Sequence, residues 1–141
     1  MNRITKEFFN ESELIFIGYS QKYESFCMNV FQTLTQHGIK VYPINTRSDA
    51  KFTIKVFRSL SELPKTPTIA YVLTNQENTR KLIPQLKEIG IKKILFQSKK
   101  NVDQAALDLC QELKIETALG CPMMVFGSGI HKIHAFFTGV R

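Results

Sequence analysis

The sequence has few residues that cross-link a chain and no segment that would anchor it in a membrane. It contains three cysteines and no tryptophan in 141 residues. Cys27, Cys110 and Cys121 are too few, and odd in number, for a disulfide framework, and they lack the Cys-x-x-Cys spacing of a structural zinc site. No apolar run approaches the roughly 20 residues that cross a bilayer, and the first thirteen residues lack the apolar core of a signal peptide. These absences predict a soluble protein with free thiols in the cytoplasm.

Glycine and proline are also sparse, with seven and five residues, which excludes a collagen-like or low-complexity chain. The hydrophobic share of 43% and the charged share of 22% are ordinary for a globular protein. A chain of this length fits one domain with its own core. We therefore expect a single domain over residues 1–141, with a core at 13–122 and a helical tail at 123–141.

The chain carries more positive than negative side chains. Lysine and arginine number 19 against 12 acidic residues, so the formal net charge is +7. This excess favours an anionic partner, either a phosphorylated small molecule or a nucleic acid. The basic residues between Lys51 and Lys100 are dispersed and form no run, which favours the small molecule.

Short apolar runs alternate with helical periodicity along the chain. Residues 14–17 form a continuous apolar run, which is typical of a strand buried on both faces. Cys27, Val30, Phe31 and Leu34 then recur at the spacing of an amphipathic helix. Further strands are expected at 39–44, 68–73, 91–97 and 115–119, and a short edge strand near 55–57. Strands separated by helices indicate βαβ units. The sequence predicts the α/β class, as a three-layer Rossmann-like fold with a mainly parallel sheet of five to six strands.

Capping residues predict where the helices begin and end. Gly38 and Gly90 are placed to end two helices, and Asn75 and Asn101 are placed to begin two others. Pro84 falls inside a helical pattern and predicts a kink or two abutting helices.

The candidate binding residues follow the predicted strands. Ligands of open parallel sheets bind at the carboxyl ends of the strands, near the point where the strand order reverses. The loop after the first apolar run opens onto a helix N-terminus, which favours phosphate. There Gly18 permits close approach of the backbone, Ser20 offers a hydroxyl and Lys22 a positive charge. The full set at this edge is Gly18, Tyr19, Ser20, Gln21, Lys22, Asn45, Thr46, Arg47, Thr74, Asn75, Gln97 and Ser98.

A classical NAD site is disfavoured by two features. The positions after Gly18 read Tyr-Ser-Gln-Lys-Tyr, so the GxGxxG fingerprint is absent. The end of the second strand carries Asn45, Thr46 and Arg47, where an NAD-binding domain has an acidic residue for the ribose. The same two features do not disfavour a more phosphorylated nucleotide.

Five short segments occur in a recognisable order and spacing: 18–20 (Gly-Tyr-Ser), 41–45 (Val-Tyr-Pro-Ile-Asn), 59–64 (Ser-Leu-Ser-Glu-Leu-Pro), 96–97 (Phe-Gln) and 121–123 (Cys-Pro-Met). In these the chain resembles the small stand-alone CoA-binding domain proteins, whose fold is similar to the N-terminal domain of the succinyl-CoA synthetase α subunit. The resemblance runs from about Leu14 to Pro122.

The resemblance implies that coenzyme A lies across the sheet edge. The loop at 18–22 would face phosphate, the turn at 45–47 would flank the adenosine, and Thr74 and Asn75 would line the pantetheine. The chain departs from the family pattern at Leu95, at Lys99 and over 74–76, so a related adenine nucleotide stays an alternative ligand.

No catalytic group and no metal site is predicted. The three histidines form no Ser/His/Asp or Cys/His constellation, and His131 and His134 lack a third ligand. Cys27 is interpreted as a buried packing residue, with a reactive thiolate as the alternative.

We therefore expect a protein that binds coenzyme A or an acyl-CoA as a carrier, sensor or accessory protein, without catalysis of its own. The alternatives are an NAD(H)-type sensor or enzyme subunit, and an interaction module whose crevice is vestigial. An apolar stripe at Ile130, Ile133, Phe137 and Val140 further predicts a homodimer.

Overall fold

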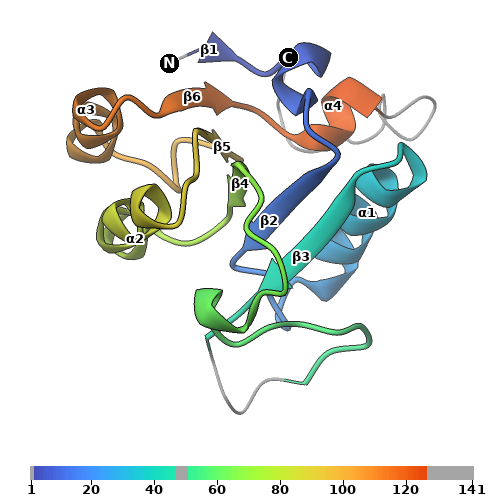
Figure 1. Cartoon of the computed structure of the whole chain (residues 1–141). Coiled ribbons are helices and arrows are strands. Elements are labelled where there is room, and N and C mark those ends of the chain that lie inside the picture. Colours follow the sequence, from blue (N-terminus) through green and yellow to red (C-terminus); the bar gives the residue numbers. More distant parts are fainter. Residues whose placement is uncertain (1, 47–50, 127–141) are drawn as a thin grey trace.

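The computed structural model describes residues 2–46 and 51–126, which form one six-stranded sheet between helices (Figure 1). The strands are β1 Asn2–Arg3, β2 Glu13–Ile17, β3 Lys40–Ile44, β4 Ile69–Val72, β5 Lys93–Phe96 and β6 Glu116–Leu119. The helices are α1 Glu24–Gln36, α2 Gln76–Glu88, α3 Gln104–Glu112 and α4 Pro122–Phe126, with short 3-10 helices η1 Lys6–Phe9 and η2 Leu60–Glu62. The strand order is β1-β6-β5-β4-β2-β3, and every neighbouring pair is parallel. The predicted Rossmann-like α/β fold is confirmed.

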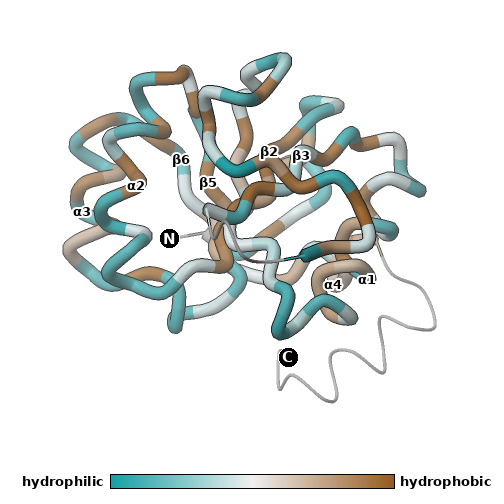
Figure 2. The backbone as a smooth tube through the Cα atoms, turned by 90° about the horizontal axis from the view of Figure 1, so that it is seen from below, coloured by the Kyte–Doolittle hydropathy of each residue, from teal (hydrophilic) through white to brown (hydrophobic). Residues whose placement is uncertain are grey.

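The sheet separates two apolar cores, one under each helical layer. Leu14 and Phe16 pack on the side of α1 and α4, whereas Ile15 and Ile17 pack on the side of α2 and α3. Side chains alternate between the two faces of a strand, and both faces of β2 are covered, which explains its unbroken apolar run. Figure 2 shows apolar colour along β2, β3 and β5 and polar colour along much of the outer helix α2.

The helix ends agree with the glycine signals. Beyond α1, the N–H of Gly38 donates to the carbonyl of Thr35 (3.1 Å) and the N–H of Ile39 to that of Leu34 (3.0 Å). This is a Schellman motif, and Gly38 has the required positive φ of 82°. Gly90 closes α2 in the same way, with a φ of 102°.

Two predicted features differ in detail. A single helix runs through Pro84, so the alternative of two abutting helices is wrong, and a kink at Pro84 stays a prediction. The proline removes a hydrogen bond to the carbonyl of Arg80, and both residues are exposed, so water can satisfy that carbonyl. The expected edge strand is reduced to one bridge between Ile44 and Phe57.

The N-cap of α3 is Asp103, not the predicted Asn101. The Asp103 carboxylate accepts from the N–H of Ala106 at 2.9 Å. Both residue types are good caps, but the Asn101 side chain is 8% exposed and bonds to neighbouring loops.

Strand β1 was not predicted. It pairs Asn2 with Ala118 and Arg3 with Leu119 of β6, and two residues are too short to display a strand period. Arg47, the two tail histidines and the predicted tail stripe lie outside the described residues. Among residues 2–46 and 51–126, no helix has the length and apolar character to cross a membrane.

Candidate functional site

The strand order reverses between β2 and β4. From β2 the chain passes to β3 on one side, and then to β4 on the other side of β2. The loops that follow β2 and β4 therefore flank the crevice in which open α/β sheets bind ligands. The candidate residues in the described part of the chain all lie on the loops at this carboxyl edge (Figure 1).

Gly18 is required at the centre of this edge for two reasons. Its φ is +90°, and a Cβ added to it would lie 3.1 Å from the backbone and side chain at Leu73 and Thr74. The N–H groups of Gly18 and Tyr19 both donate to the carbonyl of Ile44, at 3.0 and 3.2 Å. The ends of β2, β3 and β4 are thereby brought together.

Tyr19 contributes its backbone to the edge and its side chain to the core. The ring is fully buried and packs edge-on against Phe16 and Phe52, with centroid distances of 5.3 and 5.6 Å. Burial, with smaller contributions from Glu24 and Cys27, raises the pKa of Tyr19 to about 12. Its carbonyl accepts from Asn45 Nδ2 at 2.8 Å. Asn45 therefore ties the loop after β3 to the loop after β2.

The remainder of the loop after β2 leads into α1. Ser20 Oγ accepts from the N–H of Tyr23 at 3.2 Å, while Gln21 and Lys22 are exposed. Glu24 Oε2 accepts from both the N–H and the Oγ1 of Thr53, at 3.0 and 3.1 Å. Thr46, on the loop after β3, is exposed as well.

Cys27 is a buried packing residue. Its thiol is fully buried and accepts from the N–H of Ser20 at 3.4 Å. Burial raises the pKa of the thiol, and the bond from Ser20 offsets only part of that rise. A thiol in this environment stays protonated near neutral pH, unlike a reactive thiolate.

Asn101 joins the loops that follow β4 and β5. Its Nδ2 donates to the carbonyl of Thr74 at 3.0 Å, and its Oδ1 accepts from the N–H of Ser98 at 3.0 Å. Gln76 Nε2 adds a second link by donating to the carbonyl of Lys99 at 2.9 Å. Asn75 caps α2 as predicted, accepting from the N–H of Asn78 at 2.8 Å.

Gln97 is occupied by internal hydrogen bonds. Its Oε1 accepts from the hydroxyl of the fully buried Tyr71. A hydrogen bond from Gln97 also reaches Cys121, although burial dominates there and raises the pKa of that thiol to about 11. Gln97 thus fastens the loop after β5 to the end of β6, while the neighbouring Ser98 is half-buried.

Positive side chains stand on the surface beside this edge. Lys22 follows β2, and Lys99 and Lys100 follow β5; all three are exposed. Lysine ammonium groups with nearby backbone N–H groups suit the phosphates of a nucleotide. Within the described ranges, no group of three or more His, Cys, Asp and Glu residues is arranged to hold a metal ion.

Sequence reasoning missed four residues of this edge: Tyr23, Glu24, Gln76 and Asn101. Asn101 was identified only as a helix cap, because its partner Thr74 is 27 residues away. Tyr23 is given no role by the sequence analysis, although it is 58% exposed and follows the polar residues 20–22. An aromatic residue in a polar turn is the signal that would have identified it.

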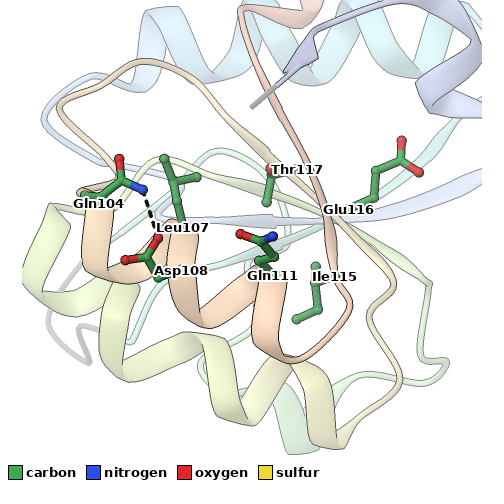
Figure 3. A pocket seen from close by; sticks show the side chains of 7 residues that line it. All are labelled: Gln104, Leu107, Asp108, Gln111, Ile115, Glu116 and Thr117. Atoms are coloured by element: carbon green, nitrogen blue, oxygen red, sulfur yellow. Dashed lines mark hydrogen bonds between the residues drawn. The ribbon is translucent and has the colours of Figure 1, made fainter.

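A separate hollow of about 370 Å³ lies along α3 and the start of β6 (Figure 3). Its strand residues lie at the amino end of β6, opposite the carboxyl edge. The lining residues are Gln104, Leu107, Asp108, Gln111, Ile115, Glu116 and Thr117. It carries two carboxylates and no positive side chain, so it does not suit a phosphorylated ligand.

The fold is that of a Rossmann-like α/β domain with positive side chains beside its carboxyl edge, and comparison with known proteins identifies its family. The family model described as "CoA binding domain" matches residues 13–127, and the chain belongs to that family. Family membership supports coenzyme A binding as the general function.

Individual relatives are more distant. The α subunit of an ADP-forming acetate–CoA ligase II from Pyrococcus furiosus is 27% identical over 90 residues, which is 63% of this chain and 20% of that protein. The chain thus spans about a fifth of the length of the curated relative it matches.

Two solved structures show the same fold. The crystal structure of Prb, described as "PH1109 protein redesigned for binding", has a TM-score of 0.72 at 18% identity, covering 100% of this chain and 97% of that one. A hypothetical protein from Pyrococcus horikoshii OT3 has a TM-score of 0.69 at 22% identity, covering 82% of each chain.

Proposed function

We propose that the carboxyl edge of the sheet binds coenzyme A or an acyl-CoA, and that the protein is a carrier, sensor or accessory protein without catalysis of its own. The observation that carries this proposal is the convergence at Gly18 of the ends of β2, β3 and β4, inside the segment that matches the CoA-binding family. Helix α1 begins beside this switch point, and the positive end of a helix favours phosphate.

Charge and thiol environment support the proposal. Lys22, Lys99 and Lys100 are exposed beside the edge, and the chain carries a net charge of +7, which suits a ligand with several phosphates. The thiols of Cys27, Cys110 and Cys121 are buried with raised pKa values, so they are poor nucleophiles in the folded protein. This favours binding over covalent catalysis.

Isothermal titration of the full chain with coenzyme A, acetyl-CoA, NADH and ATP tests the ligand. We expect coenzyme A or acetyl-CoA to bind most tightly. Preference for NADH would replace the proposal by the NAD(H)-type alternative, and preference for ATP would indicate a related adenine nucleotide. If none of the four ligands gave a heat of binding, the proposal would be wrong, and the alternative of an interaction module with a vestigial crevice would replace it.

Self-association is a separate proposal that rests on the sequence of the tail. Sedimentation at tens of micromolar compares the intact chain with one that ends at Phe126. We expect a dimer for the intact chain and a monomer for the shortened one. A monomer in both cases would contradict it.

A further inference from the structure

Tyr23 is an exposed aromatic residue next to the candidate binding residues 18–22. Among the described residues it is the one large apolar side chain that is mostly exposed, at 58%. It is the last residue of the loop after β2, and α1 begins at the next residue. Its position and exposure therefore set it apart from the other tyrosines, Tyr19, Tyr42 and Tyr71, which are all buried.

The ring of Tyr23 has no role in starting the helix. Tyr23 is the N-cap of α1, but its side chain makes no capping hydrogen bond. The backbone N–H of Tyr23 is held by Ser20 Oγ at 3.2 Å. The ring is thus attached to a fixed backbone and remains open on its surface.

A positive charge is held beside this ring. Lys22 Nζ lies 5.3 Å from the centroid of the Tyr23 ring, which is the geometry of a cation–π contact. An aromatic face with an adjacent ammonium is a combination that recognises a purine nucleotide, because the base stacks while the phosphate on its sugar meets the charge.

We propose that Tyr23 is a binding residue for the nucleotide, with the adenine ring stacked on its phenol ring and the adjacent ribose phosphate paired with Lys22. This inference rests on the proposed function, since it names the part of the site that receives the adenine end of coenzyme A. The pantetheine end then lies toward the loops after β4 and β5.

The test uses the variants Tyr23→Ala and Tyr23→Phe, with Gln36→Ala as a control at the opposite end of α1. Titration compares coenzyme A with its two halves, adenosine 3′,5′-bisphosphate and 4′-phosphopantetheine. Stacking on an aromatic side chain contributes about 1–3 kcal/mol per base. We expect Tyr23→Ala to weaken coenzyme A and adenosine bisphosphate by about tenfold or more and to leave phosphopantetheine unchanged. Tyr23→Phe should retain the affinity.

Fluorescence supplies a readout that a merely structural role would not change. The chain has four tyrosines and no tryptophan, so its intrinsic emission comes from tyrosine. A base stacked on Tyr23 should quench the exposed share of that emission when coenzyme A is added. In Tyr23→Phe the quenching should disappear although the ligand still binds.

The outcomes separate the two proposals. If the wild-type chain binds coenzyme A and Tyr23→Ala binds it equally well, the stacking role is wrong and the proposed function stands. Stacking would also be wrong if Tyr23→Ala weakened the binding of both halves of the ligand equally. It would be wrong as well if Tyr23→Ala lowered the Tm and Tyr23→Phe lost affinity for coenzyme A. If the wild-type chain binds no coenzyme A, both proposals fail.

Discussion

Gly18 and Gly90 illustrate two reasons why a position needs glycine: a positive φ, and the close approach of another segment. Both have positive φ, at 90° and 102°, but only Gly18 is crowded: an added Cβ would lie 3.1 Å from Leu73 and Thr74, whereas nothing lies within 4 Å of a Cβ at Gly90. The two positions thus share a left-handed backbone conformation, and only Gly18 also has a close contact with another segment. A pair of alanine variants measures each of these two requirements.

We expect Gly90→Ala to lower the free energy of unfolding by about 1 kcal/mol, the cost of a left-handed conformation for an L-residue. Gly18→Ala should lose more stability, because its Cβ must displace the backbone at Leu73 and Thr74, just after β4. It should also weaken coenzyme A binding. Urea unfolding and titration calorimetry measure the two effects. Equal losses of stability and unchanged binding in both variants would show that the contact at Gly18 is unimportant.

At the scale of elements, the loops after β4 and β5 depend on one side chain. Asn101→Ala would leave the carbonyl of Thr74 and the N–H of Ser98 without that partner in a largely buried site. We expect a loss of about 1–3 kcal/mol in urea unfolding. Asn101→Asp keeps an acceptor for Ser98 but places a carboxylate against the Thr74 carbonyl, so it should also be destabilising. Asn78→Ala, at an exposed position of α2, serves as the control and should change little.

The elements that the sequence predicted are those whose signal is local. Residues 14–17 and 69–72 are buried on both faces and therefore appear as apolar runs, and Gly38 and Gly90 end helices by backbone conformation alone. The elements that it missed depend on distant partners. Strand β1 exists through pairing with β6, more than a hundred residues away. Asn101 and Asp103 are equally good caps by type, and the Asn101 side chain is instead taken up by hydrogen bonds to Ser98 and to the distant Thr74.

The candidate site follows the same division. Its location could be predicted, because the carboxyl ends of parallel strands share an edge whatever their side chains. The direction of each side chain could not. Tyr19 and Gln97 look alike as polar loop residues, yet one packs into the core with Phe16 and the other bonds to Tyr71. Whether a loop side chain turns inward depends on the space left by the packed core.

At the scale of the whole molecule, buried cysteine thiols and a buried tyrosine phenol should make the stability of the fold decrease at alkaline pH. Burial raises the pKa of Cys110 and Cys121 from 9.0 to about 11, and that of Tyr19 from 10.0 to about 12. In the unfolded chain these groups ionise at their ordinary pKa, so above pH 9 the unfolded state binds fewer protons than the folded state. Their contribution to stability is therefore complete below pH 9 and is lost as pH rises toward 11 and then 12.

Urea unfolding at pH 7, 8, 9, 10 and 10.5, with reductant present, measures this loss. We expect the free energy of unfolding to be level from pH 7 to 8 and then to fall. At pH 10.5 the loss should be on the order of 2 kcal/mol for each thiol. Cys110→Ala isolates one thiol, since it removes an ionisable group from the core under α3. Its stability at pH 7 should be lower because of the smaller side chain, but its decline from pH 8 to 10.5 should be shallower than that of the wild type. A parallel decline in the two proteins would mean that Cys110 ionises with the same pKa in the folded and the unfolded chain, and would contradict its burial.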